Sequence, residues 1–201
     1  MCMAIIVNKE EKRRDIALSC RELLLEHGIK DISISKMAAT ASVGKGTIYE
    51  YFSNKEDIVF EIISIFIAEH EKTLYALIDE QISTKEKIYK ALYMLYSNDD
   101  YQKQLTIYRE FLAIALTSDN DEMVAFSTAC RTRFMTVIDK IMDEAIDKGE
   151  VIAEAKTMSS ALQTYALGLV VDTKTHRLQA SELIDAFVDA FFTLIEKKDN
   201  K

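Results

Sequence analysis

The sequence contains no proline, no tryptophan, only five glycines and only three cysteines among 201 residues. Proline interrupts helices and glycine weakens them, so their absence and scarcity favour long, uninterrupted helices. Cys2, Cys20 and Cys130 are odd in number and widely spaced, with no CxxC pair. They therefore indicate no disulfide framework, and a reducing cytoplasm is the compartment that fits them best.

Long hydrophobic runs are also missing. The longest nearly pure apolar run covers residues 62–68, far short of the roughly 18 residues that a membrane span needs. The first residues, Met1 to Val7, carry neither a basic leader nor a cleavage site, so no signal peptide is expected. The sequence predicts a cytoplasmic protein with no membrane partner.

Negative charge is in excess, but it is unevenly placed. The net charge is -8, yet residues 1–60 hold nine Lys and Arg against nine Asp and Glu. All of the excess negative charge therefore belongs to residues 61–201. A neutral N-terminal part can still bind nucleic acid, because the local field at the contact face decides whether phosphate is attracted.

The N-terminal part reads as three helices joined by short connections. Apolar and small residues at three-to-four spacing predict a first helix from Asn8 to His27, which Gly28 ends. Ser33 or Ser35 caps a second short helix that runs to about Ala41. A turn at residues 42–44 and a third helix at residues 45–51 follow. Two short helices joined by a tight turn are the plan of a helix-turn-helix, whose second helix enters the DNA major groove.

A basic cluster at the start of the first helix leaves two interpretations open. Lys9, Lys12, Arg13 and Arg14 lie close together there, mixed with three acidic residues. They either form a solvated helix face or contact DNA phosphates from the N-terminal arm.

The residue types in the third helix suit contact with DNA. Gly44 and Gly46 allow backbone N–H groups to approach a phosphate, and Lys45 can reach a phosphate or a guanine edge. Phenol groups such as those of Tyr49 and Tyr51 can donate to phosphate oxygens. The remaining expectations are a hydroxyl contact from Thr47, inward anchoring by Ile48 and Phe52, and a phosphate contact by Lys55 at the start of the next helix. A nucleotide-binding phosphate loop is rejected because G-x-x-x-x-G-K-[ST] is not matched: Ala39 and Gly46 stand at two required positions.

Residues 14–60 resemble the N-terminal domain of the tetracycline-repressor (TetR) family of transcriptional regulators. The resemblance rests on Ala17, Leu24, Gly28, Ser33, Met37-Ala38, Ala41-Ser42-Val43, Gly46-Thr47-Ile48-Tyr49, Tyr51-Phe52 and Lys55-Glu56-Asp57-Ile58. It implies DNA contacts by Ser33, Lys45, Gly46, Thr47, Tyr49, Tyr51 and Lys55. Three positions depart from the family pattern, namely Ser42 for the turn glycine, Gly44 for a serine N-cap, and Glu50 on the outer face. We expect either that Ser42 takes a conformation near the left-handed region or that the turn differs slightly from the family's.

The rest of the chain predicts further helices and no strand. A long helix from Asn54 to about Ile82 is followed by five more, which gives an all-α fold of about nine helices. The expected domains are residues 1–53, which bind DNA, and residues 54–201, which bind a ligand and dimerise. Because the last helix is apolar on more than one face, we expect the last two helices to pair with those of a second copy; the resemblance implies the same four-helix dimer interface. The expected interface residues are Leu162, Ala166, Leu169, Ile184, Phe187, Val188 and Phe191.

Aromatic side chains on the later helices are typical of a small-molecule pocket, although for any single residue a place in the core is the more ordinary interpretation. The pocket residues that we expect are Phe66, Tyr93, Tyr108, Phe111, Phe134 and Tyr165. Motifs for catalysis or metal binding are scarce: there is no HExxH and no Glu-x-x-His, and Asp172 with His176 reads as a surface pair. We therefore expect no cofactor, no metal and no enzyme activity.

These features together predict a homodimeric, ligand-responsive repressor that binds double-stranded DNA at a pseudo-palindromic operator. The small-molecule effector is not identified by the sequence. The alternative is an all-α small-molecule-binding or catalytic protein whose helix-turn-helix is vestigial. Binding to duplex DNA discriminates between the two.

Overall fold

The computed structural model describes residues 8–197, and this part of the chain is all-α, as predicted. It contains ten α-helices and two short 3-10 helices, and its only extended pairing is an isolated antiparallel bridge between Val151 and Glu196. Met1 to Val7, including Cys2, lie outside the described residues. No helix within residues 8–197 is long and apolar enough to cross a membrane.

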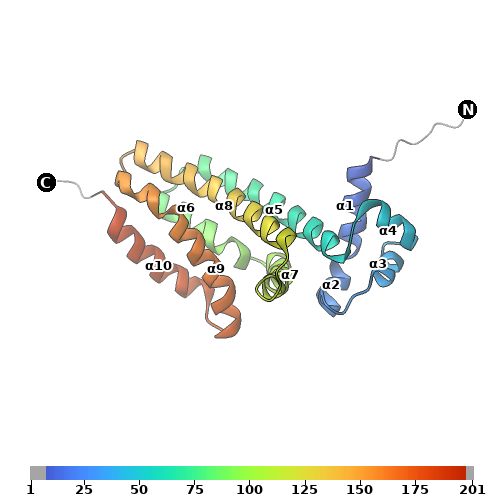
Figure 1. The fold of residues 1–201 in the computed structure, drawn as a ribbon. Helices are drawn as coiled ribbons and strands as arrows, with labels where there is room; N and C mark the ends of the chain where they lie inside the picture. Colours follow the sequence, from blue (N-terminus) through green and yellow to red (C-terminus); the bar gives the residue numbers. More distant parts are fainter. Residues whose placement is uncertain (1–7, 198–201) are drawn as a thin grey trace, which may run out of the picture. The chain divides into compact units, whose positions relative to one another are not determined.

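The helices form two compact units. Unit 1 comprises residues 8–67 and 106–119, and unit 2 comprises residues 68–105 and 120–197. The helices, drawn in Figure 1, are α1 (Lys9–Ser19), α2 (Arg21–His27), α3 (Ile34–Thr40), α4 (Lys45–Tyr51), α5 (Lys55–Asp79), α6 (Thr84–Tyr93), η1 (Met94–Tyr96), α7 (Asp99–Ala115), α8 (Asp121–Asp147), η2 (Ala153–Met158), α9 (Ser159–Thr175) and α10 (Ala180–Ile195). The boundaries of α5 and α7 place each of them partly in unit 1 and partly in unit 2. The functional division expected after residue 53 stays a prediction.

The helix expected from Asn8 to His27 is broken at Cys20, so that α1 and α2 stand in its place. The N–H of Cys20 donates to the carbonyl of Ala17 at 3.0 Å, three residues back, and not four as in a regular helix. The side chain of Cys20 is fully buried, and its Sγ lies 3.7 Å from the carbonyl oxygen of Met37 in α3. Sequence periodicity cannot reveal such a break, because the apolar spacing continues across it.

Unit 1 is held together by a small core in which each short helix contributes one apolar stripe. Its fully buried side chains include Ile16 of α1, Leu24 of α2, Met37 of α3, Ile48 of α4 and Ile58 of α5. Helices α1 to α4 are each only 7 to 11 residues long. Isolated helices of that length are marginal in water, so packing against this shared core stabilises them.

Unit 2 has the larger core. It is built from α6, α8, α9, α10 and the last part of α5, with Ile88, Ile141, Leu162 and Ile184 fully buried. Helix α8 begins directly after Asn120, whose side chain accepts from the N–H groups of Glu122 and Met123. Asn120 is therefore the N-cap of α8.

Candidate DNA-binding site

The turn between α3 and α4 has the geometry expected from its unusual serine. Ser42 has φ of 54°, within the left-handed region that glycine ordinarily occupies. The turn is closed by a hydrogen bond of 3.0 Å from the N–H of Val43 to the carbonyl of Ala38. Gly44 is the N-cap of α4 and, having no side chain, provides no capping acceptor. Both predicted departures from the family pattern are therefore present in the backbone.

Helix α4 has one buried face and one exposed face. Ile48 is fully buried, and Phe52 directly after the helix is only 2% exposed, so both anchor α4 in unit 1 as predicted. Lys45 and Gly46 are exposed, and the side chain of Tyr49 is 54% exposed. An aromatic side chain that is exposed to water lacks the stabilisation that burial would give. The exposure of Tyr49 is therefore consistent with a surface that meets a partner.

Gly46 is not required by the packing of the protein itself. A Cβ atom added there would meet no atom within 4 Å. Glycine in a helix destabilises it by about 0.5–1 kcal/mol relative to alanine. Packing within the described residues therefore does not explain a glycine at this exposed position, and the contact of Gly46 with DNA stays a prediction.

Ser33 and Lys55 have roles within unit 1. The Oγ of Ser33 accepts from the N–H of Lys36 at 3.3 Å and so caps α3. The Nζ of Lys55 donates to the carbonyl oxygen of Lys30 at 3.1 Å, which ties the start of α5 to the connection before α3. An ammonium group has three donors, so this bond leaves two more for other acceptors. The contacts of Ser33 and Lys55 with DNA stay predictions.

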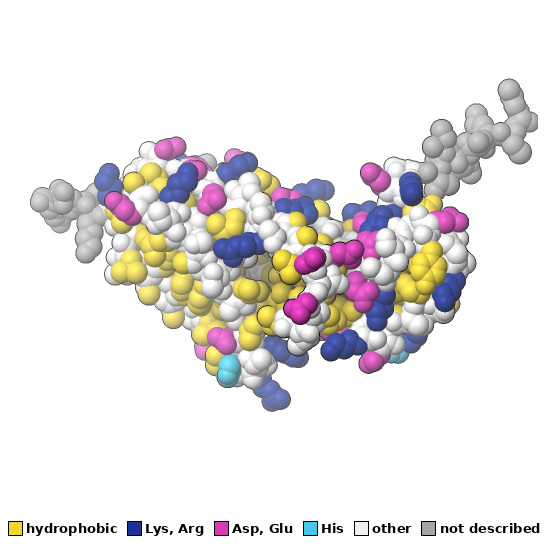
Figure 2. All heavy atoms as spheres, viewed as in Figure 1, with side chains coloured by type: hydrophobic (Ala, Val, Ile, Leu, Met, Phe, Trp, Pro, Cys, Tyr) yellow, Lys and Arg dark blue, Asp and Glu magenta, His cyan; other side chains and the backbone are white. Residues whose placement is uncertain are grey.

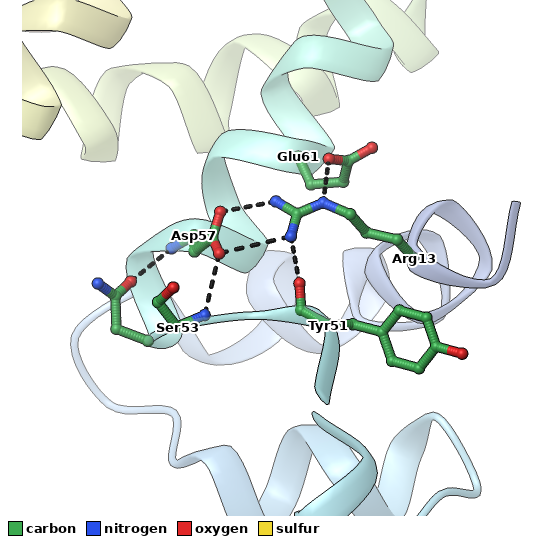
Figure 3. A network of polar contacts seen from close by, with 6 residues as sticks. Arg13, Tyr51, Ser53, Asp57 and Glu61 are labelled. Atoms are coloured by element: carbon green, nitrogen blue, oxygen red, sulfur yellow. Dashed lines mark hydrogen bonds and ion pairs between the residues drawn. The ribbon is translucent and has the colours of Figure 1, made fainter. Parts of the chain in front are cut away.

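Arg13 lies at the centre of a polar network that the sequence left open (Figure 3). Its Nη2 is 2.6 Å from Oδ1 of Asp57, and its Nε is 2.8 Å from Oε2 of Glu61. Its Nη1 donates to the carbonyl oxygen of Tyr51, the last residue of α4. The guanidinium also lies over the ring of Phe52, 4.3 Å from the centroid. Arg13 therefore joins α1, the end of α4 and the start of α5.

Arg13 differs from the rest of the basic cluster in its contacts. Its planar guanidinium has all three of its nitrogens engaged within unit 1. Arg13 is thus held within unit 1, a role that neither of the two interpretations from the sequence included. It positions the recognition helix. The spacing of Arg13, Asp57 and Glu61 in the sequence carries no signal that could have revealed the network.

The same network shifts the ionisation of Asp57. Burial by itself would raise its pKa, but hydrogen bonds from the Arg13 side chain and from the N–H of Ser53, with the attraction of the guanidinium, outweigh burial and hold the pKa below its ordinary value. The N–H of Ser53 lies 3.0 Å from Oδ2 of Asp57. Burial would lower the pKa of Arg13, but its hydrogen bonds to Asp57 and Glu61 raise it.

Acid is expected to weaken unit 1 through Asp57. Because its pKa is lower in the folded chain than in the unfolded chain, the stabilisation is complete above the ordinary value of 3.8 and is lost as the pH falls through the folded value. The urea midpoint of the wild-type chain should therefore fall more steeply between pH 5 and pH 3 than that of Asp57→Asn. An Asp15→Asn control should keep the wild-type profile. Equal slopes for wild type and Asp57→Asn would contradict this role.

A second contact that the sequence did not reveal involves Glu110 of α7. Its Oε1 accepts from the N–H of Ile29 at 2.6 Å, just after α2 ends. Gly28 ends α2 with φ of 74° and ψ of 166°, a region open almost only to glycine. A Cβ atom at Gly28 would lie 2.7 Å from Oε1 of Glu110. Gly28 thus both stops the helix and leaves room for the carboxylate.

The six residues expected to line a ligand pocket are divided between the units. Phe66, Tyr108 and Phe111 belong to unit 1, where Phe111 packs edge-on against Phe60 with ring centroids 5.9 Å apart. Tyr93, Phe134 and Tyr165 belong to unit 2, where Tyr165 stacks on Phe187 at 3.7 Å and its hydroxyl donates to the carbonyl of Leu183 at 2.6 Å. The pocket stays a prediction.

The residues expected at a dimer interface lie mostly inside unit 2. Leu162, Leu169, Ile184, Val188 and Phe191 are buried, and Ala166 and Phe187 are partly buried against the same core. Their periodicity marks an apolar face, but the chain itself covers much of that face. The pair Asp172 and His176 lies exposed at the end of α9, with Oδ1 and Nδ1 3.4 Å apart, as expected of a surface pair.

Comparison with known proteins agrees with this architecture. The family described as bacterial regulatory proteins, tetR family, matches residues 19–62. The fatty acid metabolism regulator protein of Bacillus subtilis (strain 168) is 27% identical over 143 residues, which are 71% of this chain and 72% of that protein.

Solved structures share the fold over most of the chain. The transcriptional regulator FadR from Bacillus subtilis, in complex with stearoyl-CoA, matches with a TM-score of 0.69 at 21% identity, over 88% of this chain and 96% of that one. The SmeT–triclosan complex matches with a TM-score of 0.73 at 16% identity, over 94% of this chain and 93% of that one.

The fold and the exposed α4 define a helix-turn-helix protein of the kind found in one-component transcriptional regulators. With the match of residues 19–62, the N-terminal part of the chain is a helix-turn-helix domain of the TetR type.

Proposed function

We propose that this protein is a ligand-responsive DNA-binding repressor that acts as a homodimer. The observation that carries the proposal is the α4 surface: a helix anchored by buried Ile48 and Phe52 exposes Lys45, Gly46 and Tyr49 on one side. A helix held in this way can enter the major groove, where Lys45 and Thr47 would meet base edges. Ser33, Tyr49, Tyr51 and Lys55 would contact the flanking phosphates.

The test is binding to duplex DNA. Fragments from the region upstream of the protein's own gene are compared with scrambled duplexes of equal length and composition at moderate salt. We expect at least one fragment to bind well above the non-specific level, because specific sites are typically 10³-fold or more tighter than random DNA. Equal binding to every duplex would reject the regulator and leave the alternative, an all-α binding protein with an unused helix-turn-helix.

Lys55 and Thr47 provide a matched pair of substitutions. A phosphate contact is independent of sequence, so Lys55→Ala should weaken all duplexes alike and reduce the salt slope of log K by roughly 0.9. A base contact depends on the DNA sequence, so Thr47→Ala should relax discrimination at one base position by about 1–3 kcal/mol and leave the salt slope of log K unchanged. Binding isotherms at four salt concentrations with a set of single-base variants measure both effects. A changed preference with an unchanged slope for Lys55→Ala would remove its phosphate role.

The dimer is supported by what α9 and α10 leave exposed. Leu167 and Val171 of α9 are 39% and 47% exposed, and Leu194 of α10 is 69% exposed. Hydrophobic side chains gather over these two helices in Figure 2. Small exposed residues along the same helices, such as Gly168 and Ala190, would let a second copy approach closely. We place the dimer contact on this exposed face and not on the buried residues expected from the sequence pattern.

A charge on this face should separate the two copies. We expect Leu167→Glu to give the mass of a single chain, 22.9 kDa, where the wild type gives twice that value in sedimentation velocity. Operator affinity should fall with it, because a dimer binds two half-sites at once. Val124→Glu, at a position on α8 that is 62% exposed, is the matched control and should remain dimeric. A dimeric Leu167→Glu would place the interface elsewhere.

The effector is proposed to be a small molecule with a large apolar part. The relatives point the same way, since one is named a fatty acid metabolism regulator and the FadR structure is a complex with stearoyl-CoA. Such an effector would favour a dimer whose recognition helices no longer match successive major grooves, which requires unequal affinity for the two states.

A further inference from the structure

Glu50 of α4 departs from the family pattern, and none of the roles above uses it. Its side chain is exposed, and within residues 8–197 its carboxylate has no hydrogen bond or ion pair. Asp57 and Glu61, which follow α4 in the chain, are by contrast bound to Arg13. An unpaired carboxylate on the helix that would meet a polyanion opposes binding by charge repulsion, so its presence there requires an explanation.

Glu50 lies on the line of α4 that faces away from the core of unit 1. Ile48 marks the inner side of the helix, since it is fully buried. Gly46 and Glu50 each lie two residues from Ile48, which at about 3.6 residues per turn is about 200° around the helix axis. Because they are four residues apart, they also share one face, one turn from each other. The outermost line of α4 therefore consists of a glycine followed by a glutamate.

Glycine at position 46 leaves the side chain of Glu50 room to extend toward the DNA. Long side chains on a helix lean toward its N-terminus, over the preceding turn. For Glu50 that turn begins at Gly46, where an added Cβ atom would meet nothing within 4 Å. A helix that has no side chain at this point can lie deeper in the major groove. Glu50 would then meet base edges and not phosphates.

A carboxylate selects one of the four bases in the major groove, because it only accepts hydrogen bonds. Guanine presents N7 and O6 there, and thymine presents O4, all of which are acceptors. Adenine presents an amino group, but its own N7 lies beside that group and repels a carboxylate oxygen. Cytosine presents its N4 amino group with no acceptor of the same base next to it. Cytosine is therefore the base that fits Glu50.

We propose that Glu50 accepts a hydrogen bond from the N4 amino group of a cytosine in each half-site and so determines specificity at that base pair. The inference rests on the proposed function, because it needs α4 in the major groove. The hydrogen bond offsets the repulsion between the carboxylate and the DNA at the matching base pair. At other base pairs the repulsion remains, so Glu50 also acts against binding to unrelated sequences.

The experiment selects duplexes with the full chain from a pool randomised over the length of an operator. The bound duplexes are sequenced for the wild type and for Glu50→Ala. We expect the wild type to prefer a C·G pair at one position of each half-site, and Glu50→Ala to lose this preference alone, by about 5- to 150-fold. Glu50→Gln should move the preference at that position toward A·T, because an amide can bond N6 and N7 of adenine together.

Glu26→Ala is the matched control. Glu26 belongs to α2, and 71% of its side chain is exposed. Its removal changes the net charge of the chain as Glu50→Ala does but leaves α4 intact. Glu26→Ala should therefore keep every base preference of the wild type. Because the carboxylate of Glu50 has no partner within the described residues, Glu50→Ala and Glu50→Gln should melt at the temperature of the wild type.

The outcomes separate the role of Glu50 from the proposed function. If the wild type and Glu50→Ala select the same sequences, the assignment is overturned and the repressor function stands. Tighter binding of Glu50→Ala to all duplexes alike, with unchanged base preference, would mean that Glu50 only repels phosphate. A wild-type preference other than C·G at the position that Glu50→Ala alters would also overturn the assignment. If the wild type enriches no sequence, the proposed function fails, and the assignment fails with it.

Discussion

Replacing Arg13 with methionine is expected to lower the free energy of unfolding by about 2–3 kcal/mol, because it removes charge-assisted hydrogen bonds and leaves two carboxylates without their partner. Methionine keeps much of the apolar length that lies over Phe52, so the loss reports the guanidinium. The carbonyl of Tyr51 would lose its donor as well. Because that carbonyl ends α4, we expect operator affinity to fall about tenfold at temperatures where the variant is still folded. Urea unfolding and operator titration measure the two effects.

Two further variants make the Arg13 experiment specific. Lys9→Met removes a cation from an exposed position of the same helix and should leave the urea midpoint unchanged. In the double variant Arg13→Met with Asp57→Asn, the losses should be less than additive, because both substitutions remove the same contact. A wild-type midpoint in Arg13→Met would mean that the network contributes no stability, and additive losses would mean that Arg13 and Asp57 act separately.

Gly28→Ala is expected to destabilise unit 1 by about 2–4 kcal/mol. Backbone strain contributes, since φ of 74° with ψ of 166° lies in a region that residues with a Cβ occupy only at about 1–3 kcal/mol. The added methyl group also meets Oε1 of Glu110 at 2.7 Å, so the carboxylate must withdraw and release the N–H of Ile29. Thermal unfolding should show the loss as a lower melting temperature. The matched control is Gly46→Ala, where a Cβ meets nothing within 4 Å and stability should be kept or improved.

A double-mutant cycle with Glu110→Ala separates the strain from the collision. The strain remains when Glu110 is removed and the collision does not, so Gly28→Ala should cost less stability in the Glu110→Ala background. The difference between the two costs reports the contact of α7 with the end of α2. Identical costs in both backgrounds would show that the carboxylate moves aside freely and that Gly28 is required for its backbone conformation alone.

The recognition helix is the part of the site that could be predicted from the sequence. Its bounds at residues 45–51, the inward Ile48 and Phe52, and the left-handed Ser42 all follow from local chemistry: the turn, the cap and a spacing of four. Local rules act between residues a few positions apart, which is the range that sequence periodicity reports. The break at Cys20 does not follow from this periodicity, because the apolar spacing continues across it.

The contacts that hold the helix in place could not be predicted in this way. Arg13 lies 44 residues from Asp57, and Ile29 lies 81 residues from Glu110. Nothing in the residue types distinguished Arg13 from Arg14 beside it, because partner and orientation are set by how α1 packs on α5. The same holds for the last two helices, where an apolar stripe indicates burial but not whether the chain's own core or a second copy provides it.

By itself, the sequence determined the helical class, the turn and the exposed face of α4, because hydrophobic spacing, caps and glycine positions act locally. Only the tertiary structure decided which charges are structural, why Gly28 must be glycine, and which apolar residues of α9 and α10 remain exposed. It also brought His70 and Gln104, 34 positions apart in the sequence, next to each other. These features depend on packing between residues far apart in the sequence, which sets how deeply each side chain is buried and which partner it meets.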